Sequence, residues 1–222
     1  MQEKLTAKKI EKNGAIPFID TRVKADALLL NKLEKIDKIK SHFREIKETL
    51  CLDLKDDSLK DTPEREAKMH GTELFRGLDP LNEPEITLFD NKYKYDQMLV
   101  EKWISFYSNC EHHFVPIYGR AHMVYNSSGN VIELSKLNRI VNYSAKRPQI
   151  QERLTVLITK SWQKLLQTED VAGWLDAKLF YVALRGIKDT GSITITSFYG
   201  GKFKNSETNK AFFNYLQHNT EY

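Results

Sequence analysis

Four consecutive side chains, Cys110-Glu111-His112-His113, are the strongest candidates for chemistry in this sequence. A cysteine thiolate and an imidazole three residues apart can reach the same metal ion, and zinc prefers such ligands. The alternative is a polar strand end that binds nothing. The spacing therefore makes Cys110 and His113 candidate metal ligands, with His112 beside them.

A second group of polar side chains lies at the start of two predicted helices. Ser135, Lys136 and Arg139 come near the N-terminal end of the first helix. Helix N-termini and cations together suit phosphate groups. Gln151 and Glu152 open the second helix, where a carboxylate beside an amide can bind the donor edge and the carbonyl of a guanine. Ordinary helix-start acids and a solvated basic face would give the same pattern, so each segment alone leaves nucleotide binding open.

The elements that must position these groups follow from hydrophobic periodicity. Apolar residues at helical spacing predict helices over 27–50, 62–77, 135–147 and 149–167. Thr62 is the expected N-cap of the second helix, with Pro63 at its first helical position. In the last helix the expected buried stripe is Leu154, Ile158, Trp162 and Leu165.

Five segments have the composition of strands. They cover residues 85–90, 98–108, 113–126 with a break at Gly119, 172–187 and 192–199. The order of helices, strands, two helices and strands predicts an α+β fold, in which helices cover one face of an antiparallel sheet.

Length and composition limit the class of protein. The 222 residues suit one domain with a helical appendage, and we expect an arm over 1–25, a helical region over 26–80 and a sheet domain over 81–222. No apolar run approaches the roughly 20 residues of a membrane span, and the start lacks a secretory signal. The net charge of +4 suits an anionic small molecule and does not require nucleic acid. Two cysteines suggest no disulfide framework, so we expect a reducing, cytoplasmic setting.

A close resemblance to the GTP cyclohydrolase I family runs from about Asp61 to Phe203. It is carried, in this order, by DTPEREAKM, CEHHFVPIYGRAH, LSKLNRIV, RPQIQERLT and RGIKDTGSITITSFYGGKF. CEHHF and the RPQIQERLT pattern are highly specific to that family. The resemblance implies the tunnelling fold (T-fold), an antiparallel sheet with two long helices on one face plus N-terminal helices. It also implies pentameric rings, stacked in pairs as a decamer, with active sites between subunits.

The resemblance also implies a reaction, in which GTP gives 7,8-dihydroneopterin triphosphate and formate for folate and pterin synthesis. Zinc would activate a water, because it lowers the pKa of bound water, and imidazoles would move protons. By position, Cys110 and His113 match two of three zinc ligands, and His112 matches a catalytic histidine. Glu152 matches the carboxylate that anchors guanine, with Gln151 beside it. The triphosphate and ribose contacts match Ser135, Lys136, Arg139, Arg185 and Arg65.

Two positions depart from the family pattern. The third zinc-ligand cysteine and a second catalytic histidine correspond here to Tyr181 and Leu179. In the predicted strand over 172–187 side chains alternate across the sheet, so we expect Leu179, Tyr181, Ala183 and Arg185 to share one face. Both replaced positions would then still face the pocket.

Three explanations of these replacements stay open. Zinc could bind through Cys110, His113 and a substitute, either a Tyr181 phenolate, with a free pKa of about 10, or His112 at the loss of its catalytic role. Cys51 and His122 are poor substitutes, since the first lies in a helical region and the second points to the opposite strand face.

The second explanation is altered or partial chemistry on a purine or pterin nucleotide, and the third is an inactive nucleotide-binding paralogue. Catalytic zinc normally has three protein ligands plus water. We therefore expect weak or absent zinc, and binding of GTP even without turnover.

Overall fold

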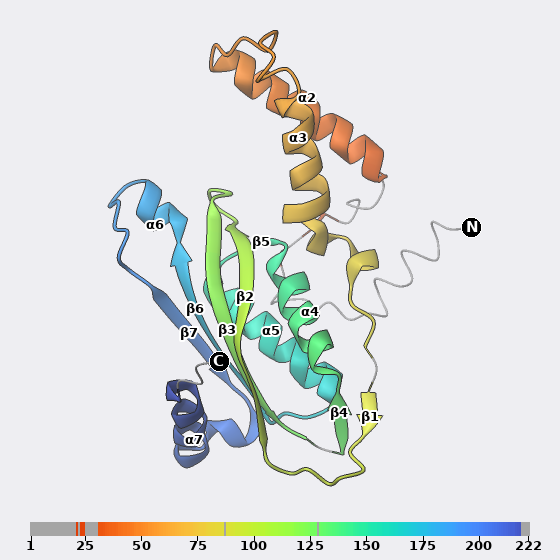
Figure 1. The fold of residues 1–222 in the computed structure, drawn as a ribbon, viewed down its shortest axis with the longest axis vertical. Helices are drawn as coiled ribbons and strands as arrows, with labels where there is room; N and C mark the ends of the chain where they lie inside the picture. The colour runs from red at the N-terminus through yellow and green to blue at the C-terminus, as the bar shows by residue number, and fades with distance from the viewer. Residues whose placement is uncertain (1–20, 22, 25–30, 87, 128, 219–222) are drawn as a thin grey trace, which may run out of the picture.

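The computed structural model describes residues 21, 23–24, 31–86, 88–127 and 129–218. Almost all of the predicted arm over 1–25 lies outside these residues. Figure 1 shows a curved sheet with helices α4 and α5 against one face and helices α2 and α3 projecting beyond one end. None of the described helices is long and apolar enough to cross a membrane.

The main sheet has five strands in the order β5-β2-β3-β6-β7. Its long strands are antiparallel to their neighbours: β2 (Met98–Cys110), β3 (Pro116–Asn126), β6 (Val171–Leu179) and β7 (Thr194–Tyr199). The two-residue strand β5 (Pro148–Gln149) runs parallel to the end of β2. Strands β1 (Leu88–Asp90) and β4 (Asn130–Ile132) pair separately. The predicted α+β fold with an antiparallel sheet is confirmed.

Helices α4 (Leu134–Ala145) and α5 (Gln151–Leu166) bury one face of this sheet. Leu154, Ile158 and Trp162 are fully buried, as predicted. Leu166, four residues beyond Trp162, completes the stripe, whereas Leu165 is only partly buried. The turn of 3.6 residues places position 166 closer to the core than position 165.

A further helix, α7 (Ser206–Gln217), was not predicted and lies against the other face of the sheet. Phe203, from a 3₁₀ turn (Gly201–Lys204), and Phe212 of α7 are buried with Val124 and Ala172. Asn205 caps α7 by accepting hydrogen bonds from the backbone N–H groups of Glu207 and Thr208. This capping signal was present in the sequence.

The N-terminal helices are α2 (Lys32–Thr49) and α3 (Thr62–Met69). A π-helical turn (His70–Leu74) and two 3₁₀ turns (Arg76–Leu78 and Pro80–Asn82) follow α3. The predicted cap is wrong by one residue: Asp61 is the N-cap, and the Thr62 hydroxyl donates to the carbonyl of Leu59. An ion pair of 3.0 Å between Lys40 and Glu64 joins α2 to α3.

Two strand predictions were wrong. Strand β3 continues through Gly119, where a Cβ atom would lie 2.2 Å from the carbonyl oxygen of Asp176 and 2.8 Å from the Phe106 ring. The glycine thus permits close approach of neighbouring strands and does not break β3. Strand β6 ends at Leu179, and residues 180–184 form the short helix α6 (Phe180–Leu184).

Candidate functional site

Three parts of the fold meet at the end of the sheet where β2 stops. Cys110 is the last residue of β2 and pairs with Gln149 of β5, which brings the start of α5 beside it. Ile117 of β3 pairs with Leu179, so β6 ends opposite the turn that carries the two histidines. This convergence brings Cys110, the first turn of α5 with Glu152, and Tyr181, which stacks on His113, to the same end of the sheet.

The Cys110 sulfur lies at the centre of a small Cys/His cluster, which consists of Cys110, His112 and His113. Its Sγ atom is 3.8 Å from Nδ1 of His113 and 3.9 Å from Nδ1 of His112. Cys110 is buried, whereas both imidazoles are exposed on the turn after β2. The backbone N–H of Glu111 donates to the carbonyl of Gln149 at 3.0 Å, which ties this turn to β5.

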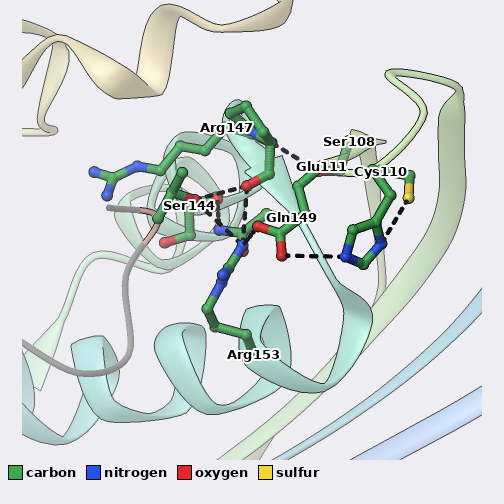
Figure 2. Close-up of polar contacts among 10 residues, drawn as sticks. Ser108, Cys110, Glu111, Ser144, Arg147, Gln149 and Arg153 are labelled. Carbon is green, nitrogen blue, oxygen red and sulfur yellow. Dashed lines mark hydrogen bonds and ion pairs between the residues drawn. The ribbon is translucent and has the colours of Figure 1, made fainter. Parts of the chain in front are cut away.

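A charged pair behind the cluster was missed by the sequence analysis. Arg153, in the first turn of α5, donates to one carboxylate oxygen of Glu111 and also to the Gln149 side chain at 3.0 Å. The other oxygen of Glu111 lies 3.7 Å from Nε2 of His112. Figure 2 shows Glu111 between Arg153 and the side of the site that holds Cys110. Arg153 therefore anchors a carboxylate that faces an imidazole of the cluster.

Tyr181 occupies the edge of the cluster. Its ring stacks on His113 with 5.5 Å between ring centroids and an interplanar angle of 27°. Burial, reinforced by the negative charges of Cys110 and Glu152, raises the pKa of Tyr181. Leu179 and Tyr181 both pack against the main core.

The predicted common face of residues 179–185 is wrong, because the segment after Leu179 is helical. Strand alternation therefore does not apply to Tyr181 and Ala183. Tyr181 instead reaches His113 from the short helix α6. Arg185 follows α6 and is exposed.

Gln151 and Glu152 open α5, as predicted, but their side chains differ in surroundings. Glu152 is exposed. Gln151 is buried, and its Nε2 donates to the carbonyls of Leu175 at 3.2 Å and Thr194 at 2.8 Å. Its Oε1 has no hydrogen-bond partner within the described structure. The Gln151 amide thus joins the start of α5 to strands β6 and β7.

Replacing Gln151 with methionine is expected to lower the free energy of unfolding by about 1–3 kcal/mol, because the buried carbonyl of Leu175 and the partly buried carbonyl of Thr194 lose a donor. Urea unfolding followed by circular dichroism measures this change. The matched control is Gln217→Met, at an exposed residue near the end of α7, which should leave stability unchanged. Equal stability of both variants would contradict a structural role of the Gln151 amide.

Two of the predicted phosphate-binding residues, Ser135 and Lys136, lie away from this cluster within one chain. Ser135 and Lys136 lie in the first turn of α4, and the last turn of α4 leads into β5 and α5. A 12-residue helix is about 18 Å long, so the two helix starts are far apart. The Ser135 hydroxyl donates to Glu133 at 2.5 Å. Arg139 is exposed one turn further along α4.

Arg65 lies on α3, in the helical region beyond the end of the sheet. Its guanidinium is 3.7 Å from the carboxylate of Asp61. Cys51 and His122 stay apart from the cluster, as predicted: Cys51 is exposed after α2, and Nε2 of His122 lies 3.0 Å from Asp176.

The metal-binding capacity of the site rests on the Cys/His cluster. Within the described part of the chain, no group of three His, Cys, Asp or Glu side chains could hold a metal ion as it stands. Ligand bonds of about 2.3 Å to sulfur and 2.0–2.1 Å to nitrogen put two ligands of one tetrahedral zinc about 3.6 Å apart. The observed 3.8 and 3.9 Å exceed this only slightly. The ligand types fit zinc, but the ring centroids of His112 and His113 are 6.3 Å apart, so these exposed imidazoles would have to turn toward each other to share one ion.

Comparisons with known proteins agree along nearly the whole chain. The family model described as GTP cyclohydrolase I matches residues 39–217. A protein named GTP cyclohydrolase 1 from Flavobacterium johnsoniae is 54% identical over 200 residues, which cover 90% of each chain. Proteins of the same name are 49% identical in Aeromonas salmonicida, over 88% of each chain, and 47% identical in Vibrio cholerae, over 83% of this chain and 85% of the relative.

Proposed function

The chain belongs to the GTP cyclohydrolase I family and has its tunnelling fold, and we propose that it converts GTP to 7,8-dihydroneopterin triphosphate and formate. One observation carries this proposal: the first turn of α5, which carries the exposed Glu152, and the Cys/His cluster lie at the same end of the sheet. The alternative, an inactive nucleotide-binding paralogue, is supported only by Leu179 and Tyr181. Relatives that cover most of the chain carry the name of the enzyme, which favours the enzyme.

Glu152 is the proposed anchor for the base. A carboxylate can accept two hydrogen bonds from the N–H groups on the edge of a guanine, and such charge-assisted bonds are strong. Its place in the first turn of α5 leaves the carboxylate accessible to a ligand. Gln151 supports this geometry, because its amide holds the start of α5 against the sheet.

Zinc is the proposed cofactor, with Cys110 and His113 as two of its ligands. When bound, zinc supplies a water whose pKa is lowered to about 7. The resemblance gives His112 the transfer of protons. His112 can transfer protons only if another side chain is the third zinc ligand. If Nδ1 of His112 itself bound the zinc, that nitrogen could not accept a proton.

The triphosphate and ribose are proposed to contact Ser135, Lys136, Arg139, Arg185 and Arg65. Since one chain keeps the start of α4 away from Glu152, neighbouring copies must supply some of these groups. We therefore propose a homo-oligomer of pentameric rings, stacked as a decamer. Strand β7 supports assembly, because it is the last strand of the sheet in the order described and carries the exposed side chain of Ile195.

The arrangement of domains and the location of the protein complete the proposal. A helical region over 26–80 precedes a T-fold domain over 81–222. The two cysteines, Cys51 and Cys110, are free thiols, which supports a reducing, cytoplasmic location.

Incubation of the purified protein with GTP tests the proposed activity. We expect one formate per GTP consumed, together with the fluorescence of a pterin after oxidation of the product. ATP is the control, because its base lacks the N–H donors that Glu152 would bind, and it should yield no formate. Binding of GTP without either product would favour the inactive paralogue, and failure to bind GTP would overturn the proposal.

A further inference from the structure

We propose that His112 replaces the missing cysteine as the third metal ligand, so that Cys110, His112 and His113 form a site for a zinc-type divalent cation. This proposal refines the cofactor site of the proposed function, but its test needs no turnover. It also changes an expectation. Weak zinc binding was expected from two ligands, and a third ligand removes the reason for it.

The positions of the two imidazoles carry the argument. Nδ1 of His112 and Nδ1 of His113 approach the same sulfur atom, at 3.9 and 3.8 Å. Both rings are exposed on one turn, so His112 can rotate toward an ion held by Cys110 and His113 without disturbing the core. The sulfur itself is buried and cannot move far, which makes it the fixed point of the site.

Other side chains near the site are less suitable. Tyr181 presents its ring face to His113, in a stacked arrangement, and Leu179 has no donor atom. Cys51 is exposed at the far end of α2, and His122 is engaged with Asp176. Glu111 is turned toward Arg153. Within the described residues, the polar side-chain contacts of the Cys110 sulfur are with His112 and His113.

Glu111 and Arg153 give His112 the orientation that a ligand needs. A carboxylate beside one ring nitrogen favours N–H at that nitrogen and leaves the lone pair of the other for a metal. Glu111 lies 3.7 Å from Nε2 of His112, whereas Nδ1 of the same ring approaches the Cys110 sulfur. An N–H at Nε2, directed toward Glu111, would leave the lone pair of Nδ1 for a metal. Arg153 restrains Glu111 and is itself bonded to Gln149 and the carbonyl of Pro148 (Figure 2).

This assignment has a consequence for the reaction. An imidazole that binds a metal through Nδ1 and donates through Nε2 has no nitrogen left to carry protons. Because Leu179 replaces the second histidine, the described cluster would then retain no uncommitted imidazole. The metal site is kept at the expense of proton transfer, and slow turnover follows.

Metal content and cobalt spectroscopy of the full chain test the assignment. The unchanged protein and Tyr181→Phe should each bind one zinc per chain. Each should also give, with Co²⁺, a thiolate-to-cobalt charge-transfer band and the intense visible bands of four-coordinate cobalt. His112→Ala should bind zinc at least about tenfold more weakly and lose the four-coordinate spectrum, as expected when one of three ligands is removed. His112→Gln serves as a second variant of similar size, and circular dichroism verifies folding.

A supporting variant is Glu111→Gln, which should weaken zinc binding about tenfold or more, because outer-shell partners contribute that much to metal affinity. Unchanged zinc affinity in both His112 variants would overturn the assignment, as would loss of zinc in Tyr181→Phe or a wild-type protein that binds no zinc. Bound zinc without formate release would leave this assignment standing and contradict the proposed function instead.

Discussion

The double variant Leu179→His with Tyr181→Cys is expected to release formate from GTP about a hundredfold faster than the unchanged chain. The new cysteine beside His113 would complete the metal site and free His112 for proton transfer. The new histidine at the end of β6, opposite Ile117, would add a second imidazole. A well-placed general acid or base contributes about 10²–10⁴-fold to a rate. Each single substitution supplies either the third metal ligand or the second imidazole, but not both. The rate gains of the two single variants together should therefore be smaller than the gain of the double variant.

Formate assay and pterin fluorescence measure this gain, with both single variants in parallel. The matched control is Leu184→His, which places an imidazole on the same short helix at a leucine that is 64% exposed, and it should give no increase. A correctly assembled double variant without faster formate release would show that the pocket has diverged at more than these two positions.

Replacing Glu152 with alanine is expected to weaken GTP binding by about a hundredfold. Hydrogen bonds to a charged group contribute about 1.5–3 kcal/mol each, and tenfold in affinity corresponds to about 1.4 kcal/mol. Loss of a carboxylate that accepts two such bonds therefore removes at least two factors of ten. Isothermal calorimetry without added metal measures the binding step separately from turnover.

The control for Glu152 is Glu169→Ala, at an exposed glutamate that precedes β6, which should bind GTP as the unchanged chain does. A second control is the ligand ATP, whose affinity should change little in Glu152→Ala. If Glu152→Ala binds GTP with unchanged affinity, the start of α5 is not the base-binding site.

Much of the fold could be predicted because helices and strands depend largely on neighbouring residues. The apolar stripe of α5 and the positions of β2 and β3 followed from periodicity, and the resemblance indicated the T-fold. The errors came where contacts with residues distant in the sequence determine whether a strand continues. Gly119 resembles a strand break until Asp176 and Phe106 are seen against it. The sequence also does not show that β6 ends at Leu179, because residues 179–184 are apolar throughout and fit a strand as well as a helix.

In the candidate site, too, some features follow from the sequence and others from the tertiary structure. By itself the sequence determined which residue types are present: a Cys/His run, a glutamate at a helix start, and two replaced positions at Leu179 and Tyr181. Only the tertiary structure decided that Arg153 restrains Glu111, 42 residues away, and that Glu111 in turn faces His112. The reason is physical: composition and spacing limit what a side chain can bind, but its direction is set by the distant groups packed around it.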